Sequence, residues 1–388
     1  MSKLKEEKRK KIKLKFKLKD NFKELNKSSK GMTLIALVIA IIIVLLILAV
    51  GILIVMLTEE NKGSIETEIS KNLSQIEDTK PFLPDEAEVI EGNLEKGVVI
   101  KDSNGNEWTW IEVPKSIYEN TEYNGGKAPK NSDDYAKIEI TMQNYAKNYR
   151  SKCADTWDSE KQNGFSSEEE YNNYKKQMLK SVYENGGFYI GKYETGTNIL
   201  RTSSNEELTP PVIQEGAYPY NYVTNKQAQE KSKELATGGR TSSLMFGIQW
   251  DLVLKHIENK QGKTQVELEE DSTTWGNYSN ETFELVKGKY SIDDGQTFTE
   301  VNGKYTKPSN DVVLLTTGAT ERNSVLNIYD LAGNEAEWTL EKSTYPGATG
   351  VTRGGVFNNK GSTVPAFFRI GSSPSYSGSY ISFRSTLW

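Results

Sequence analysis

The sequence predicts an α+β domain that is held at a membrane by one N-terminal transmembrane helix. Three observations point to this class. Residues 32–57 contain no charged side chain. Residues 97–113, GVVIKDSNGNEWTWIEV, read as two strands around an Asn104-Gly105 turn, which is typical of a β-hairpin. Residues 246–258, FGIQWDLVLKHIE, place apolar side chains at helical spacing, which is typical of a helix with one buried face.

The uncharged run is long enough to cross a bilayer. As a helix it would extend roughly 39 Å at about 1.5 Å per residue, against a hydrocarbon core of about 30 Å. Residues 1–31 hold 13 Lys/Arg and 4 Asp/Glu, which is a local charge of +9. Because the whole chain has a net charge of −5, residues 32–388 carry −14. Because positive flanks stay in the cytoplasm, we expect residues 58–388 to lie outside the cell. A buried core helix and a cleaved secretory signal are the alternatives, and the run is too long for an ordinary signal core.

The junction between the basic leader and the apolar run is more specific. Residues 30–53, KGMTLIALVIAIIIVLLILAVGIL, resemble the leader of type IV prepilins. The resemblance implies that a prepilin peptidase cuts after Gly31, which makes Met32 the new N-terminus, and that the chain joins a pilus-like assembly. Pilins usually carry Glu five residues after the cut, where this chain has Ala36. In pilins this Glu helps the subunits to register in the pilus, and this chain lacks it. A plain signal anchor is the alternative.

The outer part divides into a linker and a folded domain. Residues 58–87 are polar and are interrupted by Pro81 and Pro84, which indicates a stalk. Residues 88–388 form the predicted ectodomain, with a polar insertion at about 262–312. A strand is expected at 186–196, and helices are expected near residues 134–150, 166–183, 225–236 and 246–258.

Composition excludes several classes of site. The chain has one cysteine, Cys153, and one histidine, His256. An intramolecular disulfide and a zinc site built from cysteine and histidine are therefore impossible. We expect Cys153 to be a small, partly buried residue and His256 to be packed or at the surface. The acidic outer part has no basic patch, which argues against nucleic-acid binding, and no glycine-rich segment has the strand–GxGxxG–helix order of a dinucleotide site.

One segment carries two acids around a tight turn. In residues 327–341, NIYDLAGNEAEWTLE, Asp330 and Glu337 flank Ala332-Gly333-Asn334, and Trp338 follows. Paired carboxylates can act as general acid and base. Carboxylate and carbonyl oxygens can also hold a hard cation such as calcium. The third reading is a stiff corner of the fold, with Trp338 in the core.

Three segments together resemble the domain of formylglycine-generating, sulfatase-modifying enzymes. They are FYIGKYETG (188–196), IYDLAGNEAEWT (328–339) and RGGVF…ISFR (353–384), and they occur in the order of that family. The resemblance covers about residues 97–388 and implies a C-type-lectin-like α+β fold. It also implies calcium (Ca2+) at the middle segment, with side-chain oxygens from Asp330 and Glu337 and backbone carbonyls from Gly333 and Glu335.

The same resemblance speaks against catalysis. The family performs a copper-assisted oxidation with two cysteines, and their positions fall on or near Asn359 and Val364. Neither residue supplies a thiolate, which is the nucleophile and soft metal ligand that this chemistry needs. A relative that uses iron needs several histidines. We therefore expect that the protein is not an enzyme.

The C-terminal segment is the candidate binding region. Residues 358–380 contain no acidic side chain and are rich in Asn, Ser, Gly, Tyr and Phe, a composition typical of antibody-like contact surfaces. The candidate contact residues are Asn358, Asn359, Phe367, Phe368, Ser373, Tyr376 and Tyr380. Ordinary strands and turns are the alternative. The segment also resembles the variable region of retroelement-diversified proteins, which share this fold and vary between an Arg-Gly-Gly and a final Phe-Arg.

These observations lead to one functional hypothesis and two alternatives. We predict a single-pass, prepilin-like membrane protein of the cell surface. Its non-catalytic, lectin-like domain would bind an external protein or glycan through the C-terminal loops. The alternatives are a degenerate or atypical enzyme of the sulfatase-modifying family and a minor pilin subunit that contacts only its own assembly.

Overall fold

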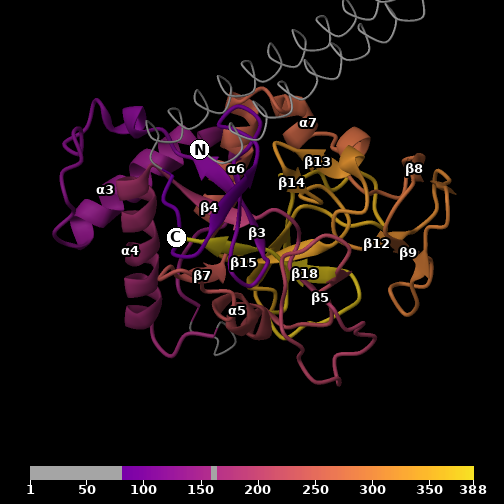
Figure 1. Cartoon of the computed structure of the whole chain (residues 1–388). Coiled ribbons are helices and arrows are strands. Elements are labelled where there is room, and N and C mark those ends of the chain that lie inside the picture. Colours follow the sequence, from indigo (N-terminus) through magenta and orange to yellow (C-terminus); the bar gives the residue numbers. More distant parts are fainter. Residues whose placement is uncertain (1–80, 159–163) are drawn as a thin grey trace, which may run out of the picture. The chain divides into compact units, whose positions relative to one another are not determined.

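The computed structural model describes residues 81–158 and 164–388 (Figure 1). The leader, the predicted span at residues 32–57 and the processing residues Gly31 and Met32 lie outside the described residues. Across the two described ranges, no helix combines the length and the apolarity that crossing a membrane requires.

Six antiparallel strands form the larger sheet, in the order β1-β2-β3-β4-β19-β7. The predicted hairpin is its β2–β3 pair. In the turn, Gly105 has φ +81°, and the Asp102 carboxylate accepts the backbone amides of Asn104 and Asn106 at 2.9 Å each. The strands are β1 (Glu88–Glu91), β2 (Val99–Lys101), β3 (Glu107–Glu112), β4 (Gly187–Gly191), β7 (Ser242–Leu244) and β19 (Ser385–Leu387).

A second sheet contains four strands in the order β17-β16-β15-β18. Strands β15 and β18 are parallel, with Glu337 opposite Ser382, and the other pairs are antiparallel. Because β18 is followed at once by β19, the end of the chain connects the two sheets through Arg384. The strands are β15 (Ala336–Lys342), β16 (Gly350–Arg353), β17 (Arg369–Ser372) and β18 (Ile381–Phe383).

The helices agree closely with the sequence expectations because their ends carry capping residues. The Ser167 side chain accepts the Glu170 amide at the start of α4, and Gly186 ends that helix at φ +72°. Thr224 and Gln227 form a reciprocal cap at the start of α5. The α-helices are α3 (Ser132–Tyr145), α4 (Glu168–Asn185), α5 (Asn225–Lys233), α6 (Gly247–Asn259) and α7 (Gln265–Glu269). The short 3-10 helices are η1 (Lys115–Tyr118), η2 (Lys147–Tyr149), η3 (Thr273–Trp275) and η4 (Glu321–Asn323).

The predicted insertion folds into short hairpins on the side of the molecule away from α3 and α4 (Figure 1). Its residues Phe283 and Leu285 form a small apolar cluster with Val313, Leu315 and Ala319, which follow the predicted insertion. Its strands are β8 (Phe283–Leu285), β9 (Lys289–Ser291), β10 (Thr299–Glu300) and β11 (Tyr305–Lys307), and β12 (Leu314–Leu315), just after it, pairs with β9. Two further short pairs are β5 (Gly196–Thr197) with β6 (Tyr218–Pro219), and β13 (Ser324–Val325) with β14 (Ile328–Tyr329).

Two tryptophans are buried in the core and hydrogen-bond to the backbone of distant segments. The indole N–H of Trp250 donates to the Ala366 carbonyl at 3.1 Å, and that of Trp338 donates to the Val223 carbonyl at 3.0 Å. Both side chains are fully buried. A smaller cluster includes Phe82, whose ring lies 5.1 Å from that of Tyr189. The packed unit therefore begins before residue 88, inside the segment that the sequence placed in the stalk.

The structure is α+β, as predicted. Cys153 is half-buried, and His256 is packed inside, 3% exposed. The Nδ1 atom of His256 accepts the Glu112 amide at 3.2 Å. Burial lowers the pKa of His256 to about 3, so the imidazole is neutral at physiological pH.

Candidate functional site

The C-terminal candidates fall on two loops, one on each side of β17 in the chain. The first loop covers residues 354–368 and the second covers residues 373–380. Four of the candidates are exposed, namely Asn358, Asn359, Tyr376 and Tyr380, whereas Phe367, Phe368 and Ser373 are half-buried.

Tyr376 and Tyr380 form a pair at the surface. Their ring centroids are 5.7 Å apart, and the Tyr376 hydroxyl donates to the Tyr380 hydroxyl. Each residue is 37% exposed. Partial burial, together with the bond to Tyr380, raises the pKa of Tyr376. A Cβ on Gly378 would lie 2.4 Å from the Tyr376 hydroxyl, so the ring folds over this glycine.

The second loop is held to the rest of the domain along its whole length. The carbonyl of Pro374 accepts the Asn225 amide at 3.0 Å, and the carbonyl of Gly378 accepts the Tyr222 amide at 3.0 Å. The carbonyl of Tyr380 accepts the Ala336 amide at 3.1 Å. Backbone bonds of this kind fix a loop without using its side chains, so the tyrosine rings stay available for contacts.

A third tyrosine, Tyr222, belongs to this surface although the sequence did not single it out. Its backbone adopts φ +55°, and its carbonyl accepts a bond from the buried Arg201 guanidinium at 3.2 Å. Its hydroxyl accepts from the Gln296 side chain at 2.7 Å. Proximity to Tyr222 also contributes to the raised pKa of Tyr376. The only sequence signal was a tyrosine-rich run, AYPYNYV, at residues 217–223.

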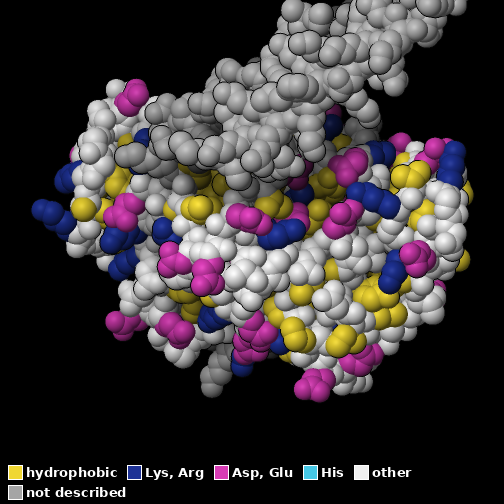
Figure 2. Space-filling view, viewed as in Figure 1, with side chains coloured by type: hydrophobic (Ala, Val, Ile, Leu, Met, Phe, Trp, Pro, Cys, Tyr) yellow, Lys and Arg dark blue, Asp and Glu magenta, His cyan; other side chains and the backbone are white. Residues whose placement is uncertain are grey.

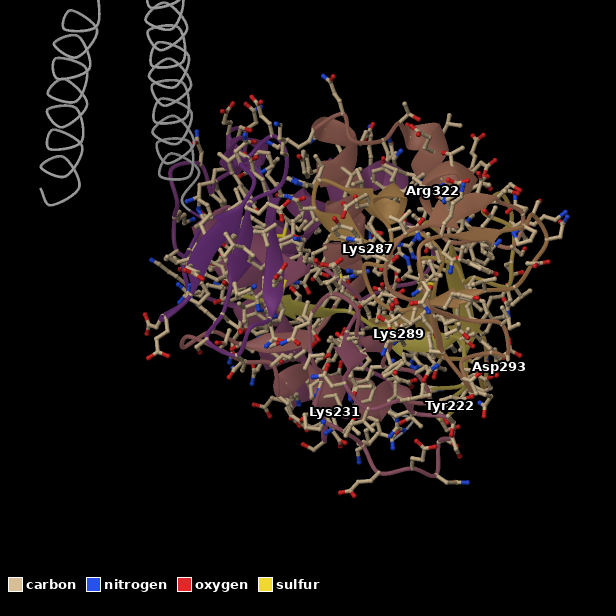
Figure 3. The ribbon with its side chains drawn as sticks, turned by 45° about the vertical axis from the view of Figure 1, so that its right-hand side comes forward. Tyr222, Lys231, Lys287, Lys289, Asp293 and Arg322 are labelled. Atoms are coloured by element: carbon tan, nitrogen blue, oxygen red, sulfur yellow. The ribbon has the colours of Figure 1, made fainter. Side chains whose placement is uncertain are left out.

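The insertion therefore reaches the tyrosine surface through Gln296. Figure 3 shows Tyr222 and Asp293 of the insertion on the same side of the molecule. Hydrogen bonds from Thr297 and Ser291 lower the pKa of Asp293 to about 2 and make this turn rigid. Figure 2 shows hydrophobic side chains over the region of β5 and β12, with charged side chains at their border.

The first loop forms a separate patch. The Asn359 carbonyl accepts the Ser279 amide at 2.9 Å, and the Asn359 side chain donates to that of Asn358. The Phe367 ring packs near Tyr149, with centroids 6.5 Å apart. Within residues 81–158 and 164–388, no hydrogen bond or ring contact joins this loop to the Tyr376–Tyr380 pair. The seven candidates thus form two patches rather than one surface.

Buried ion pairs fix β17 between the two patches. Arg369 donates to Glu341 at 2.8 Å and to Asp251 at 2.6 Å. Arg353, of the Arg-Gly-Gly motif, donates to the same two carboxylates at 3.1 Å each. Arg150 completes the set with a bond to Asp251 at 2.5 Å. Because Asp251 is shared among three guanidinium groups and Glu341 between two, β17, which connects the two loops, has little freedom to shift.

The predicted calcium residues lie beneath the tyrosine surface. Both Glu337 oxygens accept from Arg384, with N···O distances of 2.7 and 3.1 Å. The Asp330 carboxylate accepts the Gly318 amide at 2.8 Å. Gly333 packs so closely on Asn277 that a Cβ would lie 2.2 Å from its carbonyl oxygen.

The described residues do not fit a calcium ion held by the Asp330 and Glu337 side chains in this arrangement, because Arg384 already occupies the Glu337 carboxylate. Across residues 81–158 and 164–388, no group of three or more acidic, His or Cys side chains is placed to hold a metal ion. Calcium binding stays a prediction.

The carboxyl groups of the predicted calcium residues and of Glu194 are buried, which favours a structural role for them. Asp330 and Glu337 are each 1% exposed, and burial raises the pKa of each to about 6. Glu194, which accepts the Glu335 amide at 3.0 Å, is fully buried, and desolvation raises its pKa and that of Glu335 well above the usual range. Carboxyls without solvent access cannot reach an external substrate, so the geometry favours a role in the fold. Glu194 and Arg384 were missed as individual residues, although both lie in the quoted motifs.

Comparison with known proteins finds only distant structural similarity. No protein-family model matches the sequence, and no curated protein matches it. Variable protein 1 of Treponema denticola is similar in structure, with a TM-score of 0.30 and 17% identity over 52% of this chain and 84% of that one. The crystal structure of CarF gives a TM-score of 0.21 and 14% identity over 72% and 85%. Scores this low do not establish a common fold, so the site rests on its own geometry.

Proposed function

We propose that this protein is a non-catalytic binding protein of the cell surface, whose ligand contacts the tyrosine surface formed by Tyr222, Tyr376 and Tyr380. The observation that carries the proposal is the exposed Tyr376–Tyr380 pair on a loop bonded to the domain along its backbone. Tyrosine supplies a large amphipathic contact area at low entropic cost, and the neighbouring Ser and Gly residues adapt to the ligand's polar groups.

Ion pairs and backbone hydrogen bonds around the second loop favour a preformed binding surface over a loop that moves. The Glu337–Arg384 pair lies next to the end of the second loop, because Arg384 follows β18, and the ion pairs of Arg353 and Arg369 hold the start of β17, next to the first loop. A loop fixed in advance loses little entropy when its ligand binds, which raises affinity for a given contact area. The ligand class that this surface fits is a protein or glycan with aromatic-compatible faces and hydrogen-bonding groups.

The wider setting of the proposal comes from the sequence. A basic leader and residues 32–57 would anchor the chain in the cell membrane with the domain outside. The motif order would give the domain a C-type-lectin-like fold. Processing after Gly31 by a prepilin peptidase and diversification of residues 356–382 would be refinements of the same function.

The test is direct binding by the full chain. Arrays of glycans and of extracellular proteins are probed with the wild type and with the double variant Tyr376→Ala/Tyr380→Ala. A matched control is Tyr345→Ala, because Tyr345 is 71% exposed and lies on the β15–β16 loop. We expect at least one probe to bind the wild type and the control equally, and the double variant at least roughly tenfold more weakly.

Two outcomes would contradict the proposal. One is binding that is equally strong in the double variant. The other is a complete lack of binding on both arrays, with the wild type shown to be folded by circular dichroism.

Diversification has its own test, which is sequencing of codons 353–388 across many cells of one culture. Substitutions confined to codons 356–382, with Arg353 and Arg384 unchanged, would support a diversified binding protein. A uniform sequence would leave a binding protein with one fixed ligand.

A further inference from the structure

Three tyrosines stand at every second position of the run AYPYNYV, residues 217–223, and two of them carry a cation from the same chain. The Lys289 ammonium lies 4.8 Å from the centroid of the Tyr218 ring and donates to its hydroxyl at 3.1 Å. The Arg201 guanidinium lies 5.6 Å from the centroid of the Tyr220 ring. Cations are attracted to the negative face of an aromatic ring. The third tyrosine of the series is Tyr222.

The tyrosine surface has no such cation from its own chain. Within residues 81–158 and 164–388, no Lys or Arg lies over the ring of Tyr222, Tyr376 or Tyr380. Tyr376 and Tyr380 are each 37% exposed and Tyr222 is half-buried, so part of this surface is open to a partner from outside. Residues 370–383 contain no Lys, Arg, Asp or Glu, so the second loop supplies no charge. A cation on these rings would have to come from a ligand.

An acidic turn of the insertion lies beside this surface. The Gln296 side chain donates to the Tyr222 hydroxyl at 2.7 Å. A Cβ on Gly295 would lie 3.4 Å from the side-chain nitrogen of Asn221, so the turn packs against the residue that precedes Tyr222. Asp294 comes two residues before Gln296 and is exposed. The turn therefore brings a solvent-accessible carboxylate to the edge of the tyrosine surface.

The Asp294 carboxylate acts on the tyrosine surface from this position. Burial raises the pKa of Tyr222, and proximity to the carboxyl groups of Glu335 and Asp294 raises it further. Glu335 is fully buried, so Asp294 is the carboxyl group of the two that a ligand can reach. The neighbouring Asp293 accepts the Thr297 hydroxyl at 2.6 Å, which holds the turn in one conformation. A turn that is fixed in advance presents its charge at a small entropic cost.

The basic side chains of the adjoining segments already have partners. Arg201 is 1% exposed and donates to the Tyr222 carbonyl at 3.2 Å, on the inner side of the surface. Lys289, which lies in β9 just before the turn, is held at Tyr218. In the part of the chain that the structure describes, no salt bridge joins Asp294 to a Lys or Arg. A cationic group of a ligand would therefore meet an unpaired carboxylate next to exposed tyrosine rings.

We propose that the ligand of the tyrosine surface is a protein that presents a cationic side chain, which lies against the tyrosine rings and pairs with Asp294. This inference rests on the proposed function and narrows its ligand class. Arginine fits best, because its planar guanidinium can stack on a ring and still bond to a carboxylate. A neutral saccharide would gain nothing from the charge of Asp294, and an acidic saccharide would be repelled by it.

The experiment titrates the full chain, held in an uncharged detergent, with four peptides of the form acetyl-Gly-Ser-X-Ser-Gly-amide. In these peptides X is arginine, its neutral analogue citrulline, lysine or N-acetyl-lysine, so each cation has an uncharged counterpart of similar shape. Ligand-observed NMR gives the dissociation constants. The titrations are repeated in about 0.05 M and about 0.5 M NaCl, because salt screens an exposed ion pair.

Three variants locate the binding. Asp294→Asn removes the charge and keeps the turn, because asparagine tolerates the φ of +56° found at this residue. Asp311→Asn is the matched control, since it makes the same change at another exposed acid of the insertion, whose carboxylate lies near Tyr305 of β11. Tyr376→Ala/Tyr380→Ala removes the exposed rings. Thermal unfolding checks that every variant folds.

We expect the arginine peptide to bind the wild type roughly three- to fivefold more tightly than the citrulline peptide does. Asp294→Asn and high salt should each abolish this difference, whereas Asp311→Asn should leave it unchanged. Tyr376→Ala/Tyr380→Ala should weaken the binding of the arginine peptide. The lysine peptide should show the same dependence on charge, with a smaller gain over its acetylated counterpart.

Several outcomes would overturn the inference. These are equal binding of the charged and neutral peptides, equal effects of Asp294→Asn and Asp311→Asn, a lack of binding by every peptide, and peptide binding that survives Tyr376→Ala/Tyr380→Ala. The proposed function can stand when the inference fails. A glycan or protein on the arrays whose binding needs Tyr376 and Tyr380 but is unchanged in Asp294→Asn would overturn the cationic ligand and leave the tyrosine surface as the binding site.

Discussion

The carboxylate of Glu337 and the guanidinium of Arg384 are joined inside the domain, with the shortest N···O distance at 2.7 Å. The remaining Arg384 donors bond to the carbonyls of Gly191 and Tyr329 at 2.8 Å each. Glu337 belongs to β15 in the four-stranded sheet, whereas Gly191 ends β4 in the six-stranded sheet. One guanidinium thus ties the two sheets together beneath the second loop.

We expect Glu337→Gln to destabilise the domain by about 3–5 kcal/mol, because it leaves the buried Arg384 without a counter-charge. Chemical denaturation of wild type and variant measures the difference. Glu230→Gln serves as the control, since the Lys226–Glu230 pair is exposed and 3.9 Å apart, and should change the unfolding free energy by less than about 1 kcal/mol. Equal effects of the two substitutions would show that the Glu337–Arg384 pair is not a structural tie.

His256 should make the domain sensitive to acid. Its pKa is lowered to about 3 in the folded state from an ordinary value of 6.5, so the unfolded chain binds the proton more tightly between these values. The wild type should therefore lose about 1.4 kcal/mol per pH unit from this residue as the pH falls below 6.5. The raised pKa values of Asp330 and Glu337 act in the opposite direction below pH 6, so the overall stability curve does not isolate the histidine.

The difference between wild type and His256→Gln does isolate it. The glutamine oxygen can still accept the Glu112 amide and does not titrate. We expect the stability advantage of the wild type over this variant to shrink between pH 7 and pH 5, as measured by urea unfolding. An advantage that stays constant with pH would contradict the prediction.

Gly378→Ala should separate the tyrosine pair without unfolding the domain. The new methyl group would lie 2.4 Å from the Tyr376 hydroxyl, which is the far end of a side chain that can move. We expect the pKa of Tyr376, followed by phenolate absorbance, to fall toward its usual value and the melting temperature to change little. Ser377→Ala is the neighbouring control. A Tyr376 titration unchanged by Gly378→Ala would show that the pairing does not depend on this glycine.

Calcium provides a test of the resemblance itself. If calcium binds as the resemblance implies, it must displace Arg384 from the Glu337 carboxylate, and the melting temperature of the domain should rise relative to that in a chelator. An unchanged melting temperature would contradict this prediction. A ligand that binds only the folded state at 100 times its dissociation constant would add about 2.7 kcal/mol of stability. A clear rise in melting temperature that is abolished in Asp330→Asn would establish a calcium site despite the ion pair.

Local signals in the sequence were sufficient for the β2–β3 hairpin and for helices α3, α4, α5 and α6, but not for most of the other strands. The Asn104-Gly105 turn predicted the β2–β3 hairpin, and Ser167 and Gly186 mark the two ends of α4. These features depend on a few neighbouring residues, so a single sequence contains them. The start of the packed unit was less visible, since Phe82 enters the core only through contacts with Trp110 and Tyr189, which are distant in the chain.

For the candidate site, the sequence predicted less and the tertiary structure decided more. Composition alone indicated that Tyr376 and Tyr380 belong to a contact surface, and the structure exposes both. Composition could not tell that Asn358 and Phe367 lie on a different patch, nor that Tyr222 completes the tyrosine surface from more than 150 residues away.

The sequence by itself determined the charge asymmetry, the long uncharged run, the absence of a cysteine pair and the helices and hairpin of the domain. These properties follow from composition and from periodicities of a few residues. Only the tertiary structure decided that Glu337 is paired with Arg384 and that Tyr222 lies beside Tyr376 and Tyr380. Such partners are chosen by how two sheets and several loops pack, and packing brings together residues that no local pattern connects.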